Sequence, residues 1–461
     1  GANNTAVGKS ALGSNTTASN NTAVGKNSLT ANTTGSSNNA FGEGALDANT
    51  VGTNNTAIGN AALGAEVAGQ FSVAIGNNAL RDQSNSSSAD VHNTAVGLNA
   101  GKTITTGKLN TLIGGLAGDA ITTAESNVAV GYDALGDTTT GGDNTAVGEL
   151  ALANNTTGIR NVALGSSALF TKTTGNDNVA IGAAALYANT TASNNIAVGT
   201  GALEANTTGA SNVAVGRSAL DANQAGADNV AIGMNALTTS ISGNENVAVG
   251  TDALKLATGS YNTGIGWNAL ATTNTGAGNT AVGREALILN TTGAGNVGIG
   301  RETLRSNTTA SLNTALGFLT MRANTTGVNN TALGANALTA NTTGASNVAV
   351  GEDALDTNTT GDSNIAIGMD ALDANTTADD NIAIGRFALG VNTTGASNVA
   401  IGNFVLDANT TASSNTGVGF EALTSNTTGE LNTAIGFHAM KDNSTGDRNV
   451  AVGYGALQDM N

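Results

Sequence analysis

A unit of seventeen residues recurs along this chain and limits what it can fold into. Aligned on the glycine of the motif Asn-Thr-Ala-Val-Gly, the 461 residues contain 27 copies with the consensus N-x-A-[VI]-G-x-x-A-L-x-x-N-T-T-G-x-x. Position 5 is glycine in every copy, and position 1 is asparagine in all copies but one, which has Ser72. A unit this short buries its apolar face only against its neighbours, so the repeat predicts a solenoid.

Each unit has the residue pattern of one coil of a parallel β-solenoid. Positions 1 to 5, as in Asn-Val-Ala-Val-Gly, are β-branched and apolar at every second place, which predicts a short strand. Glycine at position 5 predicts a turn or bulge, Ala-Leu at positions 8 and 9 a second extended piece, and Asn-Thr-Thr-Gly another turn. We expect the interior to contain Ala at 3 and 8, Val or Ile at 4, and Leu at 9. Seventeen residues are too few for a helical hairpin repeat.

Stacked identical coils place identical residues one above another. Parallel stacks of this kind use asparagine ladders, in which each side-chain amide bonds to the next, to satisfy buried polar groups and set the register. The sequence predicts two such ladders and a column of turn glycines. Their members in the most regular stretch are Asn347, Asn364, Asn381 and Asn398 at position 1, Asn358, Asn375, Asn392 and Asn409 at position 12, and Gly351, Gly368, Gly385 and Gly402 at position 5.

The predicted strand is apolar on both faces, because position 3 is mostly Ala while positions 2 and 4 are Thr, Val or Ile. Such a strand is usually covered on both sides. The core of the coil covers one side, and a homotrimer about a shared axis supplies a cover for the other. A flattened single-chain solenoid is the alternative.

The motifs Asn-Val-Ala-Val-Gly, Asn-Ile-Ala-Ile-Gly and Ser-Val-Ala-Ile-Gly (residues 72–76) resemble the YadA-type head repeats of trimeric autotransporter adhesins. The longer pattern NTAVGxxALxxNTTG is similar to shaft repeats in phage tail-fibre proteins and bacterial surface proteins. The resemblance covers the whole chain and implies a left-handed β-roll, three chains to a fibre, and an extracellular location on a bacterial surface or a virion. Head units of that family are commonly shorter than seventeen residues, and no stalk coiled coil or membrane anchor is recognisable here.

Composition argues against several classes of function. The net charge of −17 disfavours nucleic acid and anionic membranes as partners, and no apolar run approaches the roughly 18 residues of a membrane span. There is no cysteine, and the two histidines, His92 and His438, lie about twenty coils apart. We find no nucleophile motif, no phosphate-binding loop and no cofactor motif, so we expect no enzymatic activity and no cofactor.

Three local features are candidate sites. Asp356 and Asp373 occupy the same position in adjacent coils and predict either a weak Ca²⁺ site or a solvated acidic face. Asn392-Thr393-Thr394 matches a glycosylation acceptor, although turn and ladder formation explain the same residues. The polar insertion at residues 81–92 is either a binding loop or an irregularity of the repeat with no binding role. Its candidate contacts are Arg81, Asp82, Asp90 and His92.

Together these patterns predict a single β-solenoid domain over residues 1–461, with irregular coils at 72–126 and no terminal caps. The expected function is that of a structural and adhesive extracellular fibre, which holds a repetitive surface away from a cell or virion and attaches to an unidentified receptor. The alternatives are a self-polymerising extracellular filament subunit, whose copies stack end to end, and the shaft of a phage tail fibre used in host recognition.

Overall fold

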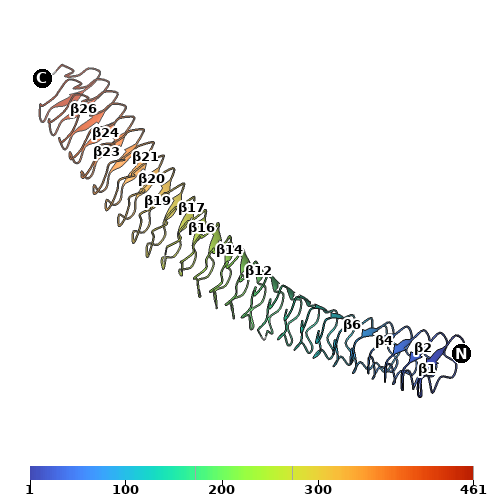
Figure 1. Cartoon of the computed structure of the whole chain (residues 1–461). Helices are drawn as coiled ribbons and strands as arrows, with labels where there is room; N and C mark the ends of the chain where they lie inside the picture. Colours follow the sequence, from blue (N-terminus) through green and yellow to red (C-terminus); the bar gives the residue numbers. More distant parts are fainter. Residues whose placement is uncertain (172, 273, 460–461) are drawn as a thin grey trace. The chain divides into compact units, whose positions relative to one another are not determined.

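The computed structural model describes residues 1–171, 173–272 and 274–459. In this part of the chain all regular structure is β, in strands of three residues, and no helix is found that could span a membrane. The chain separates into two units, Gly1–Asn229 and Val230–Asn461, each of which is a stack of parallel coils (Figure 1). The expected fold class, an all-β parallel solenoid with seventeen residues per turn, is confirmed.

The strands of each unit all come from positions 2 to 4 of the repeat. In the first unit they are β1 (Thr5–Val7), β2 (Thr22–Val24), β3 (Asn39–Phe41), β4 (Thr56–Ile58), β5 (Val73–Ile75), β6 (Thr94–Val96), β7 (Thr111–Ile113), β8 (Val128–Val130), β9 (Thr145–Val147), β10 (Val162–Leu164), β11 (Val179–Ile181), β12 (Ile196–Val198) and β13 (Val213–Val215). In the second unit they are β14 (Val230–Ile232), β15 (Val247–Val249), β16 (Thr263–Ile265), β17 (Thr280–Val282), β18 (Val297–Ile299), β19 (Thr314–Leu316), β20 (Thr331–Leu333), β21 (Val348–Val350), β22 (Ile365–Ile367), β23 (Ile382–Ile384), β24 (Val399–Ile401), β25 (Thr416–Val418), β26 (Thr433–Ile435) and β27 (Val450–Val452).

Within each unit every strand pairs in parallel with the strands of the preceding and following coils. The register joins equivalent residues, as in Ile365 with Ile382. It is kept across the longer interval, where Val73 pairs with Thr94, and across the shorter one, where Val247 pairs with Thr263. Insertions and deletions are therefore absorbed outside the strands, and the ladder of hydrogen bonds continues without a slip.

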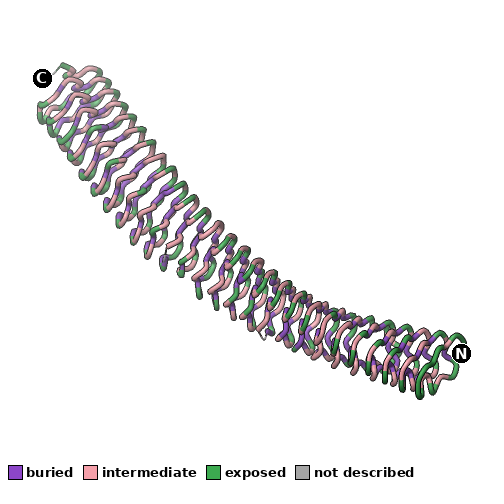
Figure 2. The backbone as a smooth tube through the Cα atoms, viewed as in Figure 1, coloured by how far each residue is buried: buried purple, intermediate pink, exposed green. Residues whose placement is uncertain are grey.

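The core of a coil is narrower than the sequence suggested. Ala349, Ala354 and Leu355, at positions 3, 8 and 9, are fully buried, and buried residues recur in every coil (Figure 2). The expectation that Val or Ile at position 4 belongs to the interior is wrong, because Ile367 in that place is 38% exposed. Successive residues of a strand point to opposite faces, so an inward position 3 forces positions 2 and 4 outward.

The predicted second extended piece at Ala-Leu is also wrong, since positions 6 to 10 form a turn. Asp353 and Leu355, at positions 7 and 9, take left-handed backbone conformations with φ of 56° and 54°. Such conformations cost a non-glycine residue about 1–2 kcal/mol. Here the turn is held because the Leu355 N–H donates to the Ala371 carbonyl of the next coil at 3.0 Å, while the leucine side chain fills the core.

Glycine at position 5 is required by both conformation and space. Gly351 has a φ of 137°, and a Cβ added there would lie 2.5 Å from the carbonyl oxygen of Gly368 in the next coil. Gly368, Gly385 and Gly402 repeat this arrangement. The backbones of adjacent coils therefore approach too closely along the glycine column to admit a side chain.

Candidate functional site

The asparagines at position 1 form a hydrogen-bonded ladder in the interior of each unit, which Ser72 interrupts in the first unit. The Asn364 side-chain oxygen accepts from the backbone N–H of Asn381 at 3.0 Å, and its Nδ2 donates to the carbonyl of Ala378 at 2.8 Å. The first bond joins one coil to the next, and the second closes the coil on itself. The remaining members, Asn347, Asn381 and Asn398, make the same bonds.

The asparagines at position 12 form a second ladder beside the first. Asn375 Nδ2 donates to Asn358 Oδ1 at 2.8 Å and to the carbonyl of Ala378 at 3.1 Å. Asn392 and Asn409 continue the column, and the side chains in both ladders are fully buried. Because these amides are enclosed and hydrogen-bonded, they contribute to the stability of the stack and are not available to a ligand.

The glycosylation motif at Asn392 belongs to this second ladder. Its asparagine is fully buried, and the Thr393 hydroxyl donates to the carbonyl of Thr410 in the next coil at 2.9 Å. A sugar on this nitrogen would replace one of the two amide hydrogens that bond to Asn375 and Gly395, and would place a bulky group in the core. The geometry therefore favours the turn-and-ladder explanation of the motif.

The outer face of the sheet carries an apolar column, which consists of the position 4 side chain of every coil and is called here the outer column. It contains only Val, Ile, Leu and Phe. Its members are partly exposed, with Ile299 at 36%, Ile401 at 39% and Leu333 at 44%. Thr, Val or Ile at position 2 lies beside it and is partly exposed in most coils. Within each unit the outer column is therefore a narrow apolar stripe that follows the stack.

The insertion at residues 81–92 does not gather its four candidate contacts into one site. Arg81 and Asp82 form a bidentate ion pair with each other at 2.7 Å, at the start of the insertion. Asp90 pairs through its backbone with Gln70, and the His92 ring stacks on Phe71 with centroids 5.0 Å apart. The contacts of Asp90 and His92 fasten the insertion to the neighbouring coil, and residues 86–88 remain exposed.

A buried carboxylate that our sequence analysis missed anchors the same insertion. Glu66 is fully buried at position 12, where asparagine is usual. Its Oε1 accepts from the backbone N–H groups of Ala68, Gly69 and Asn85 at 3.1, 2.6 and 3.2 Å. Its Oε2 accepts from the side chains of Gln83 and Asn85 at 2.8 and 2.9 Å. The break in the asparagine column was the available signal for this role.

The irregular coils after the insertion keep a filled core by exchanging residues between positions. Gly101 and Gly118 replace leucine at position 9, and the space is occupied by Leu112, which replaces alanine at position 3. A Cβ added at Gly101 would lie 2.7 Å from Leu112 Cδ1. Ile104 and Ile121, at position 12, complete the apolar filling. The irregularity is a repacked core, and these residues are not exposed for binding.

Asp356 and Asp373 lie on adjacent coils in a cluster of like charge. Burial, and then the nearby carboxylates of Asp356, Asp370 and Asp353, raise the pKa of Asp373 to about 6. Burial also raises the pKa of Asp356, against a lowering by a hydrogen bond from Thr339. In the described part of the chain no group of three acidic, histidine or cysteine side chains is placed to hold a metal ion. The weak Ca²⁺ candidate therefore gains no support from the geometry.

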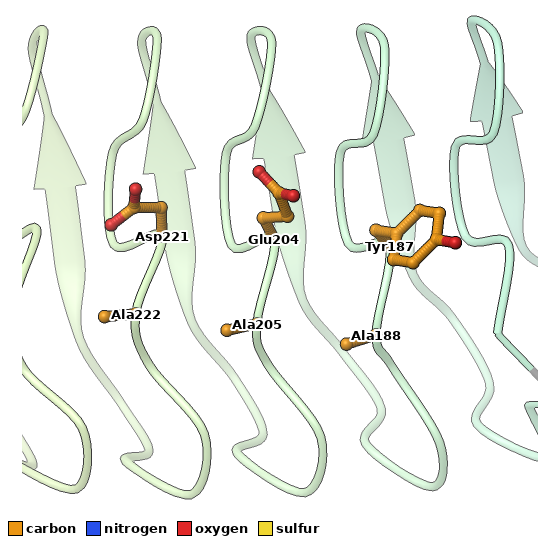
Figure 3. Close-up of a pocket in the computed structure, with 6 residues that line it drawn as sticks. All are labelled: Tyr187, Ala188, Glu204, Ala205, Asp221 and Ala222. Atoms are coloured by element: carbon orange, nitrogen blue, oxygen red, sulfur yellow. The ribbon is translucent and has the colours of Figure 1, made fainter.

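An open groove of about 400 Å³ lies along positions 10 and 11 of three successive coils in the first unit. Figure 3 shows the ring of Tyr187 and the carboxylates of Glu204 and Asp221 on the same side of these coils, above three alanines. Burial raises the pKa of Asp221, and the charge of Glu204 raises it further. The groove has the electrostatics to attract a cation, but it contains no nucleophile or paired acid and base.

No protein-family model matches the chain, and a search of curated proteins finds no match.

Proposed function

We propose that the protein is a structural and adhesive extracellular fibre, in which several chains associate along their outer columns, most simply as a homotrimer. The support is a contrast: the polar and apolar side chains of the interior are all covered, whereas apolar side chains on the outer strand face are not. Two asparagine ladders and a filled alanine-leucine core make each coil rigid, while an apolar stripe remains open on the strand face. In this proposal the fibre is located on a bacterial surface or a virion.

The outer column is the single observation that carries the proposal. A polar residue at position 4 would serve a solvated strand face equally well, yet the position is apolar in every copy. Fully burying a side chain such as Ile367 stabilises by about 1.5–3 kcal/mol, so covering its remaining exposed fraction contributes about 1 kcal/mol per coil. Association costs roughly 4–15 kcal/mol, so many coils in succession are needed to exceed it.

A common axis explains why the stripe is narrow. Three chains that turn the same narrow stripe towards one axis cover it completely, and the remaining columns stay in solvent. The repeated surface then presents every contact many times along the fibre. Weak single contacts to a receptor combine into lasting attachment when many are made together.

The mass of the assembly in solution tests this proposal. We expect three times the chain mass of 44.8 kDa, and discrete rods in electron micrographs. A variant with Ile367→Glu, Ile384→Glu and Ile401→Glu places charges in the outer column of three successive coils and should lower the mass towards that of one chain.

The matched control changes exposed threonines of the same three coils, Thr377→Glu, Thr394→Glu and Thr411→Glu, and should leave the mass unchanged. A wild-type chain that stays monomeric would overturn the proposal. Unbounded filaments in place of rods would favour the self-polymerising subunit.

A further inference from the structure

Four of the nine arginines of the chain lie close together on one face of the second unit. This surface, called here the arginine patch, consists of Trp267, Arg284, Arg301, Arg305, Phe318 and Arg322. Its position 6 side chains follow one another on successive coils in the order Trp267, Arg284, Arg301 and Phe318. The guanidinium carbon of Arg284 lies 5.0 Å from the centre of the Trp267 ring, and that of Arg301 lies 5.6 Å from the centre of the Phe318 ring.

The arginine patch has an excess of positive charge in a strongly acidic chain. Glu285 lies 3.3 Å from Arg284 and 3.1 Å from Arg305. Glu302 makes equivalent contacts to Arg301 and Arg322 at 3.1 and 3.0 Å. Two carboxylates therefore face four guanidinium groups, and an excess of two positive charges remains.

The two central arginines of the patch have unused binding capacity. The side chains of Arg284 and Arg301 are 55% and 53% exposed. They occupy the same column on adjacent coils, about 4.8 Å apart, where like charges repel. A negatively charged partner would relieve this repulsion, and the donors that each guanidinium still has in solvent are available to it.

A surface of opposite charge lies on the same columns a few coils further along the second unit. This acidic patch consists of five carboxylates at positions 6, 7 and 10, which are Glu352, Asp353, Asp356, Asp370 and Asp373. None of them is in an ion pair with a residue that the structure describes. Burial, and then the repulsion from Asp356, Asp370 and Asp353, raise the pKa of Asp373. The coil between the patches presents Ala335, Asn336 and Thr339, which are uncharged.

We infer that the face formed by positions 6, 7 and 10 of residues 262–397 binds a second copy of this chain in antiparallel orientation. A two-fold axis near the uncharged coil sets the arginine patch of each copy against the acidic patch of the other. This arrangement is isologous and forms the same contact twice. A parallel copy in the same register would place like charges against each other. With the axis between the coils that begin at Asn313 and Asn330, Arg301 faces Glu352 and Arg305 faces Asp356 of the other copy, and Arg284 faces the coil that carries Asp370 and Asp373.

The pairing is weak in each contact and sensitive to salt. Exposed ion pairs contribute about 0.2–1 kcal/mol each and are screened within about 10 Å at 0.1 M salt. The face is distinct from the outer column, which lies on position 4, and from position 2 beside it. Association through the apolar column does not weaken with added salt, so the two assemblies are distinguishable by ionic strength. The antiparallel contact joins fibres side by side.

A charge exchange tests the inference. One variant carries Arg284→Glu and Arg301→Glu, and the other carries Asp356→Lys and Asp373→Lys. Because other coils have Glu at position 6 and Lys at position 10, we expect both variants to fold. In sedimentation at low salt, the wild type should show a doubled mass, and 0.5 M NaCl should remove the doubling. Each variant alone should show no doubling even at low salt. An equimolar mixture should recover it, because each altered patch then faces a complementary one.

The control, Lys9→Glu with Lys26→Glu, changes the net charge as much as the arginine variant does and should pair like the wild type. The inference is overturned if the wild type shows no salt-sensitive doubling, if either variant alone pairs normally, or if the mixture fails to recover while circular dichroism is unchanged. Binding of dextran sulfate to the arginine patch without any doubling would show that the patch recognises an acidic polymer instead. None of these outcomes depends on whether the outer column forms trimers.

Discussion

Removing one side chain of the position 1 ladder should destabilise the stack far more than removing an exposed asparagine of the same coil. In Asn55→Ala two interactions are lost. The backbone N–H of Ser72 loses its acceptor, Asn55 Oδ1 at 2.9 Å, and the carbonyl of Gly69 loses its donor, Asn55 Nδ2 at 2.9 Å. In this coil Glu66 occupies position 12, so no second asparagine amide replaces the lost donor to Gly69.

The magnitude follows from the burial of the two orphaned groups. Asn55 is fully buried, and the methyl group of alanine leaves no route for water to reach them without opening the coil. Each unsatisfied buried group costs about 1–3 kcal/mol, so we expect a loss of about 2–6 kcal/mol. Because a solenoid is stabilised mainly by contacts between neighbours, the loss should be concentrated in the adjacent coils.

Native-state hydrogen exchange with peptide resolution measures this effect. Peptides that cover residues 55–72 should exchange at least about thirtyfold faster in Asn55→Ala, since every 1.4 kcal/mol corresponds to a factor of ten. Asn60→Ala is the matched control, because Asn60 is exposed and its side chain has no hydrogen bond in the structure. If both variants exchange alike, the ladder does not stabilise the stack and our reasoning about its buried amides is wrong.

Three further predictions address the core, the acidic patch and the insertion. Gly101→Leu restores the consensus residue but should lower the free energy of unfolding by about 1–3 kcal/mol, measured by thermal unfolding, because it overpacks the core. Adding Leu112→Ala should restore the lost stability. If Gly101→Leu alone stabilises the protein, the core is not repacked as described. Because the pKa of Asp373 is raised in the folded state, that state binds the proton more tightly, and the stability of the second unit should rise as pH falls from 7 towards 4. Asp373→Asn should be more stable than wild type at pH 7 and show a smaller rise; a wild-type stability that falls over this range would refute the assignment. Glu66→Ala removes the carboxylate acceptor of three backbone N–H groups and should lower the stability by on the order of 3 kcal/mol. Proteolysis at residues 86–88 should become faster. Equal cleavage rates in the variant and the wild type would show that the carboxylate does not anchor the insertion.

Much of the scaffold could be predicted from the repeat, because its spacing alone places equivalent residues in columns. Two columns of asparagine and one of glycine have few uses in a parallel stack. The structure shows the asparagines as hydrogen-bonded ladders and the glycines where adjacent backbones leave no room for a side chain. The content of the core was harder to predict. Periodicity cannot say which face of a strand is interior when both are apolar, so Val and Ile at position 4 were assigned to the wrong side.

Compensating exchanges could not be predicted either. Leu112 and Gly101 lie eleven residues apart in different coils, and only the three-dimensional packing shows that one fills the space left by the other. Glu66 stood out as an exception at position 12, but its five donors come from its own turn and from the insertion. The spacing of these residues in the sequence does not predict that the five donors converge on one carboxylate.

The sequence by itself determined that the chain stacks identical coils in register, since a constant period leaves each unit only its neighbours to pack against. Only the tertiary structure decided which residues those coils enclose and which they present. The physical reason is that the turn after Gly351 takes left-handed conformations at Asp353 and Leu355, which direct the leucine inward to join alanine. With alanine and leucine filling the interior, the β-branched side chains of the strand remain outside.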